Sequence, residues 1–394
     1  MADPQGTDSA GHQPPRSEVG AVDVRPVKGW RQLRHFIELP YWLHAHTLWV
    51  PPVRVERWLY LSRRLNPYFT HAHAQYFLAY RDERMVGRIS AQVDTAFNEF
   101  HANRWGMFGF LEFNDDPAVV EALLAAAERW LRAQRCDRMV GPMDFSLNDE
   151  SGILVEGFDL APLVKQPWHP PYYQRRCEEA GLDKAMDLLS WYLEVGDRSR
   201  LDAVLPKLAD RAYNKHGIRI RKMSRRHLRR EMDAFADIYN QAWSNNWGFV
   251  PYAKADLDAL ALELQFGFAP GWFMVAEHNG ETVGMAITLL DLNPVFTRMN
   301  GRLLPFGWWY LLNRHRFADQ VRVGFLGVKP QYQYTGAAAA LYVEHFNTAE
   351  RSPLKKGEAG WILETNTGMN RGLEAMHGRV VKRYRVYQRL FDAP

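Results

Sequence analysis

One order of apolar and polar positions occurs twice along the chain, with a period of about 190 residues. Each copy has a short strand, a helical stretch, an antiparallel strand pair, an apolar strand, an apolar helix and a further strand. Because strands alternate with helices and include antiparallel pairs, the pattern predicts an α/β fold with two similar mixed-sheet domains. The segments that correspond in the two copies are 21–27 and 217–223, 75–93 and 272–288, 106–113 and 321–328, 117–134 and 336–348, and 138–142 and 360–364.

The repeat also predicts the domain limits. We expect one domain at residues 21–196, a linker with a helix at 197–214, and a second domain at 215–394. Residues 1–20 are rich in Pro, Gly, Ser and acidic residues and have no apolar core, which predicts a disordered tail.

Composition excludes several classes of protein. The apolar fraction is 47%, the charged fraction is 24% and the net charge is +4, which fits a globular protein and gives no sign of a nucleic-acid partner. No run of 18 apolar residues occurs, so no membrane-spanning helix is expected. The two cysteines, Cys136 and Cys177, have no His or Cys at metal-binding spacing nearby. We therefore expect no metal, no disulfide framework and a cytoplasmic location.

Candidate chemistry lies at the end of the second apolar strand. The run 321–328 ends in Lys329-Pro330, and an alanine-rich helix starts directly after the next few residues. Free backbone N–H groups at a helix start attract anions, and small residues let a phosphate come close. No Lys-Ser/Thr pair follows, as a nucleotide triphosphate loop would need, and no acidic residue stands about 20 positions on at the end of a second strand, as a dinucleotide site would need. The predicted phosphate loop consists of Gln333, Tyr334, Thr335, Gly336, Ala337 and Ala338.

Three features of the second half resemble, in order, the motifs of the GNAT family of acyl-CoA N-acyltransferases. They are the loop with its Gln-x-x-Gly-x-Ala pattern, the strand 360–364 with Asn366 and Asn370 after it, and the terminal strand 382–390. The resemblance covers about residues 217–394, and the whole chain is similar to larger bacterial tandem-GNAT proteins, some of which are thought to acylate sphingoid amines. It implies two tandem GNAT-like domains, each a mixed, mostly antiparallel sheet flanked by helices.

The resemblance further implies a reaction and its co-substrate. Acetyl-CoA or a longer acyl-CoA would donate an acyl group to an amine, and Leu326 to Val328 would pair with the pantetheine amides as an added strand. The Val328 N–H would hold the thioester carbonyl. Asn366 and Asn370 would bind the cofactor, although an Asn at that position also suits a helix cap.

Two residues are candidates for proton transfer. Glu364 is the carboxylate on the strand beside the expected site and is the predicted general base, while Tyr384 on the terminal strand is the second predicted catalytic residue. The competing interpretations are an ion-paired or solvent-facing Glu364 and a core position for Tyr384. Tyr387 lies three residues further on, so at most one of the two tyrosines can face the cleft. The tyrosine that the family usually has before its last helix is replaced by Glu374.

The first half departs from the family at its own loop position. Asn114-Asp115-Asp116-Pro117 stands there, and two carboxylates would repel a diphosphate. We therefore expect this half to be a degenerate GNAT-like domain that supplies a substrate wall or an interface, while only the second half binds CoA.

Two aromatic segments bear on the acceptor. Trp243, Asn246, Trp247 and Phe249 lie where GNAT proteins shape the acceptor pocket, and their aromatic character favours a hydrophobic or sphingoid-type lipid amine. The segment 296–317 combines aromatic residues with four Arg and no acid. That composition is typical of a peripheral contact with a membrane, and it also suits a lid or a buried helix between domains.

Other functions remain compatible with the sequence. Residues 215–230 carry eight Lys or Arg and no acid, which suits the CoA phosphate, anionic lipid, or the tRNA of an aminoacyl-tRNA-dependent peptidyl-type transferase. A non-catalytic pair of domains that binds a ligand or lipid is a third hypothesis. Because the phosphate loop is intact, we expect a small-molecule or lipid amine as partner rather than nucleic acid.

Overall fold

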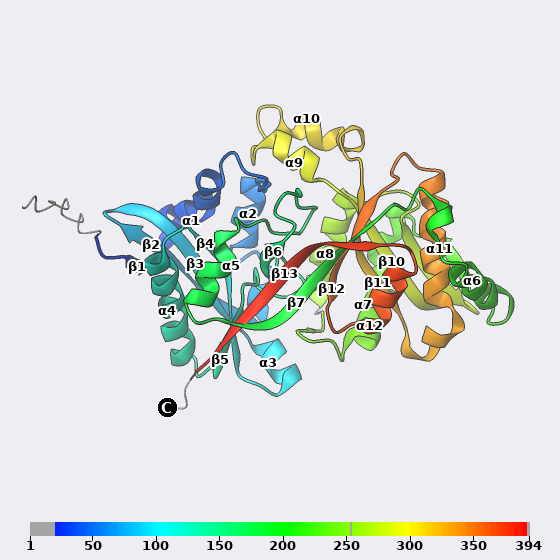
Figure 1. The fold of residues 1–394 in the computed structure, drawn as a ribbon, viewed down its shortest axis with the longest axis horizontal. Coiled ribbons are helices and arrows are strands. Elements are labelled where there is room, and N and C mark those ends of the chain that lie inside the picture. The colour runs from blue at the N-terminus through cyan, green and yellow to red at the C-terminus, as the bar shows by residue number, and fades with distance from the viewer. Residues whose placement is uncertain (1–19, 253, 392–394) are drawn as a thin grey trace, which may run out of the picture.

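One mixed sheet runs through the whole molecule in the computed structural model, which describes residues 20–252 and 254–391. The predicted disordered tail lies, apart from Gly20, outside these residues. The 13-stranded sheet has the order β1-β2-β3-β4-β5-β13-β7-β12-β11-β10-β9-β8, and β6 pairs with β13 away from this path. Helices cover its faces in two lobes (Figure 1). No helix in the described ranges is long and apolar enough to cross a membrane.

The two copies of the sequence pattern form the two lobes. The first half contains β1 (Asp23–Pro26), α1 (Gly29–Leu43), α2 (Arg54–Tyr60), β2 (Ala72–Arg81), β3 (Arg84–Asp94), α3 (Thr95–His101), β4 (Trp105–Phe113), α4 (Pro117–Ala133), β5 (Arg138–Gly141), β6 (Ile153–Glu156), α5 (Tyr172–Glu179) and β7 (Asp183–Leu193). The second contains α6 (Val204–Asn214), β8 (Arg219–Lys222), α7 (Leu228–Trp243), α8 (Lys254–Gly267), β9 (Phe273–His278), β10 (Glu281–Leu290), α9 (Asn293–Met299), α10 (Gly307–Leu312), β11 (Val321–Val328), α11 (Ala337–Glu350), β12 (Gly357–Leu363), α12 (Thr367–Glu374) and β13 (Arg379–Leu390).

The predicted fold class is confirmed. Among the described strands, β4 pairs with β5 and β11 pairs with β12 in parallel, and the other pairings are antiparallel. The predicted strand 321–328 is β11, and the predicted helix 336–348 is α11 with shifts of one or two residues at its ends.

The last strands of the two halves are exchanged. β7, from the first half, lies between β12 and β13, and β13 lies between β7 and β5. The red β13 and the green β7 run side by side across the middle of Figure 1. Each half therefore completes its sheet with a strand of the other half. The domain boundaries expected from the sequence, 21–196 and 215–394, stay a prediction.

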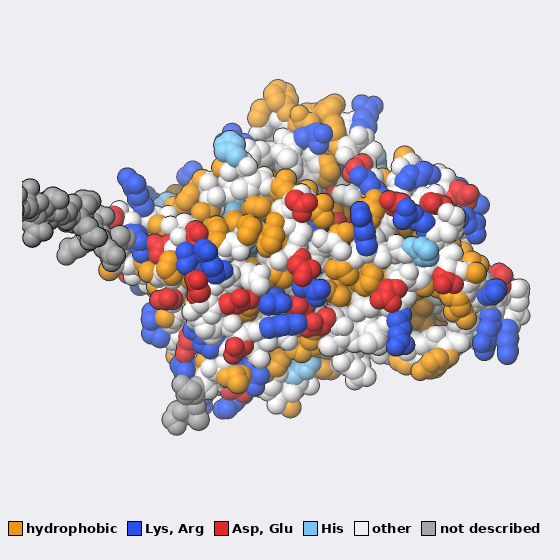
Figure 2. All heavy atoms as spheres, viewed as in Figure 1, with side chains coloured by type: hydrophobic (Ala, Val, Ile, Leu, Met, Phe, Trp, Pro, Cys, Tyr) orange, Lys and Arg blue, Asp and Glu red, His pale blue; other side chains and the backbone are white. Residues whose placement is uncertain are grey.

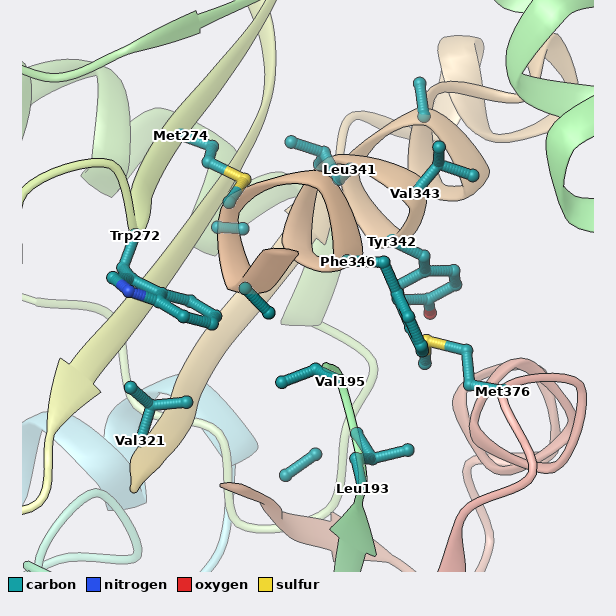
Figure 3. Packing of buried hydrophobic residues seen from close by; sticks show 14 of the residues in the cluster. Leu193, Val195, Trp272, Met274, Val321, Leu341, Tyr342, Val343, Phe346 and Met376 are labelled. Atoms are coloured by element: carbon teal, nitrogen blue, oxygen red, sulfur yellow. The ribbon is translucent and has the colours of Figure 1, made fainter. Parts of the chain in front are cut away.

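The core of the second half shows the exchange in its side chains. Leu193 and Val195, at and just after the end of β7, point into this core below Phe346 of α11 (Figure 3). Trp272 and Met274 reach the same core from the start of β9. Alanines on the buried face of α11 let the helix lie close to the sheet, because they add little bulk.

A buried ion pair joins the exchanged strands. The Lys382 ammonium on β13 lies 2.6 Å from the Glu358 carboxylate on β12, and both side chains are almost fully buried. Ser190 on β7 donates a hydrogen bond of 2.7 Å to Glu358, and the Gln166 amide donates another of 3.0 Å. Buried charges are costly unless they are paired and hydrogen-bonded in this way. The network therefore fixes the relative positions of three adjacent strands.

Breaking this pair should destabilise the whole fold. We expect Lys382→Met to lower the free energy of unfolding by about 3–5 kcal/mol, because it leaves the Glu358 carboxylate buried without its countercharge. Urea denaturation followed by circular dichroism measures the loss. The control is Lys356→Met, which removes a partly exposed pair with Asp319 at 2.8 Å and should cost under about 1 kcal/mol. Equal losses in the two variants would contradict the structural role of the network.

Candidate active site

The site is built around a gap between two parallel strands of the second half. β11 and β12 pair only over Val321–Val323 and Gly357–Ala359. The β10–β11 register then shifts between Ile287 and Thr288, which leaves Gly324 as an extra residue on β11. Beyond this point the edge of β11 that faces β12 has no strand partner in the described chain. A cavity of about 180 Å³ lies in the gap.

The predicted phosphate loop lies where the sequence places it, after β11 and before α11. A 3-10 turn (Pro330–Thr335) precedes Gly336, which has a φ of 88° at the helix start. A side chain at Gly336 would also clash with the backbone carbonyl of Leu208 on α6. The glycine is thus required by its left-handed conformation and by helix packing, a reason that the sequence argument did not include. Gln333 and Tyr334 are exposed, so the outer side of the loop is open.

The predicted acceptor residues lie together. Leu326 on β11 and Asn366 before α12 line the small cavity together with these acceptor residues. The Asn366 side chain also accepts a hydrogen bond of 3.1 Å from the Met369 N–H and so caps α12. Asn370 has a structural arrangement, because its side chain bonds to the Trp191 indole N–H at 3.0 Å and to a backbone carbonyl. The remaining residues of this cavity wall that the sequence predicted are Trp243, Asn246, Trp247 and Phe249.

The two predicted catalytic residues line neither of the cavities described in this section. Glu364 forms an ion pair of 2.8 Å with Lys184 and accepts a hydrogen bond from the Asp187 N–H. Tyr384 is fully buried, and burial raises the pKa of its hydroxyl well above the usual value. Tyr387 packs in a different apolar cluster, as the three-residue spacing predicts. The competing interpretations, an ion pair and a core position, describe where Glu364 and Tyr384 lie, and their catalytic roles stay predictions.

A larger cavity, of about 880 Å³, lies between the halves and was not predicted from the sequence. Its walls are mostly apolar. In the first half they come from α1, α2 and residues up to 71, from the end of β4, and from segments within 142–152 and 162–169; in the second half they come from α8, the end of β10 and the segment of α9 and α10. The small and large cavities adjoin, because they have wall residues in common. These shared residues are Asn148, Lys165, Tyr252, Leu260, Glu263, Leu264 and Leu289.

Three carboxyl groups face the large cavity from one segment of the first half. Burial, together with the nearby charge of Glu150, raises the pKa of Asp144 to about 8. Burial also raises the pKa values of Asp149 and Glu150. Carboxyl groups with raised pKa values can exchange protons near neutral pH. The signal that the sequence offered was three acidic residues within seven positions after an apolar strand.

The first half has no open gap at the equivalent place. Its parallel ladder ends at Met107 on β4, and the chain's own segment after β5 then lies against the free edge of β4. The Met143 N–H donates to the Phe108 carbonyl at 2.8 Å, and the Phe110 N–H donates to the Asp144 carboxylate at 2.8 Å. This segment fills the position that is empty between β11 and β12.

The acidic residues at the first half's loop position have structural partners. Asp116 caps α4 and forms an ion pair of 2.5 Å with Arg81, while Asp115 pairs with Arg176 at 2.7 Å. Part of the basic run in the second half is likewise paired, for instance Arg221 with Glu231 at 2.9 Å and Lys222 with Glu344 at 2.8 Å. For Arg221 and Lys222, these contacts favour the interpretation that this part of the basic segment 215–230 is a solvated, ion-paired surface.

Comparisons with known proteins agree with this architecture. No family model matches the chain. A solved tandem GNAT protein from the clavulanic acid biosynthesis pathway superposes with a TM-score of 0.55 over 94% of this chain and 98% of its own, at 11% identity. The paired lobes and the gap between parallel strands thus define a tandem GNAT fold, and the protein is an acyltransferase of this class.

Sequence relatives place the chain more closely. It is 34% identical to Protein YghO of Escherichia coli over 93% of this chain and 95% of that protein. It is 36% identical to the bacterial ceramide synthase of Caulobacter vibrioides over 93% of this chain and 97% of that protein. The chain belongs to the family that contains these two bacterial proteins.

The raised pKa of Asp144 predicts a pH dependence of stability. Between about pH 4 and pH 8 the folded protein holds a proton on Asp144 that the unfolded chain releases, so this group's stabilisation is lost as the pH rises. Asp144→Asn removes this titration. We expect the stability of the wild type to fall, relative to the variant, across this window in urea denaturation at several pH values. Parallel pH profiles for the two proteins would contradict the raised pKa.

Proposed function

We propose that the protein transfers an acyl group from an acyl-CoA thioester to the amine of a hydrophobic molecule, a sphingoid-type lipid amine. The observation that carries this proposal is the adjoining pair of cavities. One lies in the gap between β11 and β12, and the other is a large apolar space between the two halves. A thioester in the first and a lipid amine in the second would meet at the shared wall.

The geometry of the second half supports acyl-CoA as the donor. The unpaired edge of β11 offers backbone groups to the pantetheine amides, as an added strand would use them. The loop at residues 333–338 precedes α11, so the diphosphate would lie at a helix start with its outer side open. In the first half, the segment at Met143 and Asp144 takes the place of such a ligand.

The large cavity supports a hydrophobic acceptor. Its volume of about 880 Å³ lies within the range of roughly 300–1,000 Å³ that is usual for small-molecule sites. Its mostly apolar wall suits a hydrocarbon chain, and its carboxyl groups suit an ammonium head. The relative named bacterial ceramide synthase supports a sphingoid-type amine as acceptor for this chain as well.

The carboxyl groups of the large cavity suit the proton transfer that the reaction needs. An ammonium must lose a proton before its nitrogen can attack the thioester carbon, and Asp144, with a pKa raised to about 8, can take up that proton near neutral pH. Burial also raises the pKa values of the neighbouring Asp149 and Glu150. The new N–C bond then forms, the nitrogen loses its second proton, and the C–S bond breaks, with this second proton going to the CoA thiolate. We propose these groups as proton acceptors in place of the ion-paired Glu364.

A direct assay tests the proposed function. Purified protein with palmitoyl-CoA and sphinganine should release free CoA thiol and form the N-acyl amide in equal amounts, measured by a thiol reagent and by mass spectrometry. Absence of both products across acetyl to long-chain donors would contradict the proposal. Amide formation from aminoacyl-tRNA without CoA would support the peptidyl-type alternative instead.

The small cavity can be blocked by one substitution. Gly324 lines it, and a side chain there would meet other atoms only at ordinary contact distance, so the fold should tolerate a larger residue. We expect Gly324→Trp to abolish thiol release by filling the gap, while Gly324→Ala keeps most of the activity and both variants keep wild-type thermal stability. Full activity in Gly324→Trp would show that the thioester does not pass through this gap.

A further inference from the structure

A buried arginine beside the small cavity lacks a countercharge. Arg322 on β11 is 4% exposed and lines this cavity. Its guanidinium donates hydrogen bonds of 2.8 Å to the carbonyls of Val164 and Gly360, which hold it in a fixed orientation. It forms no ion pair within the described chain, and its buried Nε–H has no partner there. A buried donor without a partner is costly, so a ligand that accepts the hydrogen bond of this Nε–H would relieve the cost.

A second unpartnered donor lies on the opposite strand of the gap. Trp361 on β12 lines the same cavity, and its buried indole N–H has no hydrogen-bond partner in the described part of the chain. The Arg322 guanidinium carbon lies 5.2 Å from the centre of the Trp361 ring. Two buried donors without partners, one from each strand, therefore lie at the place where β11 and β12 separate. Because both groups are N–H donors without an acceptor, they favour a ligand that offers them an oxygen atom.

We propose that Arg322 and Trp361 bind the carbonyl oxygen of the acyl thioester and stabilise the negative charge it gains during transfer. This role rests on the proposed function. When the amine nitrogen attacks, the carbonyl electron pair moves onto the oxygen, and it returns when the C–S bond breaks and the thiol leaves. Donors that are fixed before the reaction stabilise this charge without having to reorganise. The two side chains would take this role in place of the Val328 N–H that the family resemblance implies, because Val328 lies six residues further along β11, about 20 Å away.

The test uses substitutions that keep shape or charge. Trp361→Phe keeps an aromatic ring but removes the N–H donor, and Arg322→Lys keeps the charge but changes the donor geometry. We expect Trp361→Phe to lower kcat for thiol release about 10²–10³-fold, with little change in the KM for acyl-CoA and in thermal stability. The control is Trp130→Phe on α4, which removes an indole N–H from the first half, away from both cavities.

The outcomes separate this site from the proposed function. An active wild type together with an unchanged kcat in Trp361→Phe would overturn the site and leave the proposed function standing. A loss of thermal stability in Trp361→Phe that accounts for the lost activity would also overturn it. A wild type that releases no thiol would overturn the proposed function and, with it, this site.

A separate surface feature concerns access to the large cavity. Residues 293–318, which hold α9, α10, their connection and the turn after α10, form a segment that we call the α9–α10 knob; it projects from the body of the molecule and exposes a cluster of large apolar side chains (Figures 1 and 2). Residues 293–318 contain four Arg and no Asp or Glu. The exposed apolar residues of the knob, each 38–74% exposed, are Leu303, Leu304, Phe306, Trp308, Trp309 and Leu312.

The knob is continuous with the large cavity. Phe296, Leu303 and Leu311 belong both to this segment and to the cavity wall. We propose that the knob docks on an anionic membrane surface, with its aromatic side chains among the headgroups and its arginines on lipid phosphates. A lipid amine could then pass from the membrane into the cavity without crossing water. This proposal extends the sequence-based expectation for 296–317 to a route for the substrate.

Vesicle flotation tests the docking. The wild type should float with phosphatidylglycerol–phosphatidylcholine vesicles and much less with phosphatidylcholine alone, because the arginines need anionic lipid. The double variant Phe306→Ser, Trp308→Ser should bind about tenfold or more weakly, since two large side chains no longer leave water. Trp30→Ser, at a tryptophan on α1 that is more exposed than Trp308, is the control and should bind as the wild type does. Unchanged binding of the double variant, or no binding by the wild type, would overturn the proposal.

Discussion

The buried ion pair between Lys382 and Glu358 is the contact on which the arrangement of the two halves depends. It joins β13 to β12 across β7, at the place where the halves exchange their last strands. Because these charges cannot separate without a large penalty, the strands around them cannot slide, and the sheet passes from one half to the other as one body. The large cavity is bounded by both halves, so its shape depends on this rigidity.

The two halves are built alike but differ at the equivalent free strand edge. In the first half, the chain's own segment after β5 bonds to the free edge of β4 and brings carboxyl groups to the large cavity. In the second half, the corresponding edge of β11 stays free and adjoins the small cavity. One half thus supplies groups suited to an acceptor amine and the other a gap suited to a thioester. The duplication yields a composite site rather than two equal ones.

The sequence predicted local structure well and long-range contacts poorly. The strand 321–328, the turn after it and the helix that follows were predicted because apolar runs, Pro and Gly act on neighbouring residues. The exchange of β7 and β13 was not, because periodicity identifies a strand but not its partner. The large cavity was not predicted either, because its walls come from segments that are distant in the sequence. Glu364 was predicted as the general base because it is a carboxylate on the strand beside the expected site. The sequence does not show its partner, and the structure shows that its charge is paired with Lys184.

A crystal structure with a non-hydrolysable long-chain acyl-CoA analogue and a sphingoid amine tests the composite site most directly. The account predicts the pantetheine between β11 and β12, its thioester-equivalent carbonyl near Arg322 and Trp361, and the hydrocarbon of the amine in the cavity between the halves. A pantetheine bound along β4, or an amine chain that lies outside the large cavity, would contradict it.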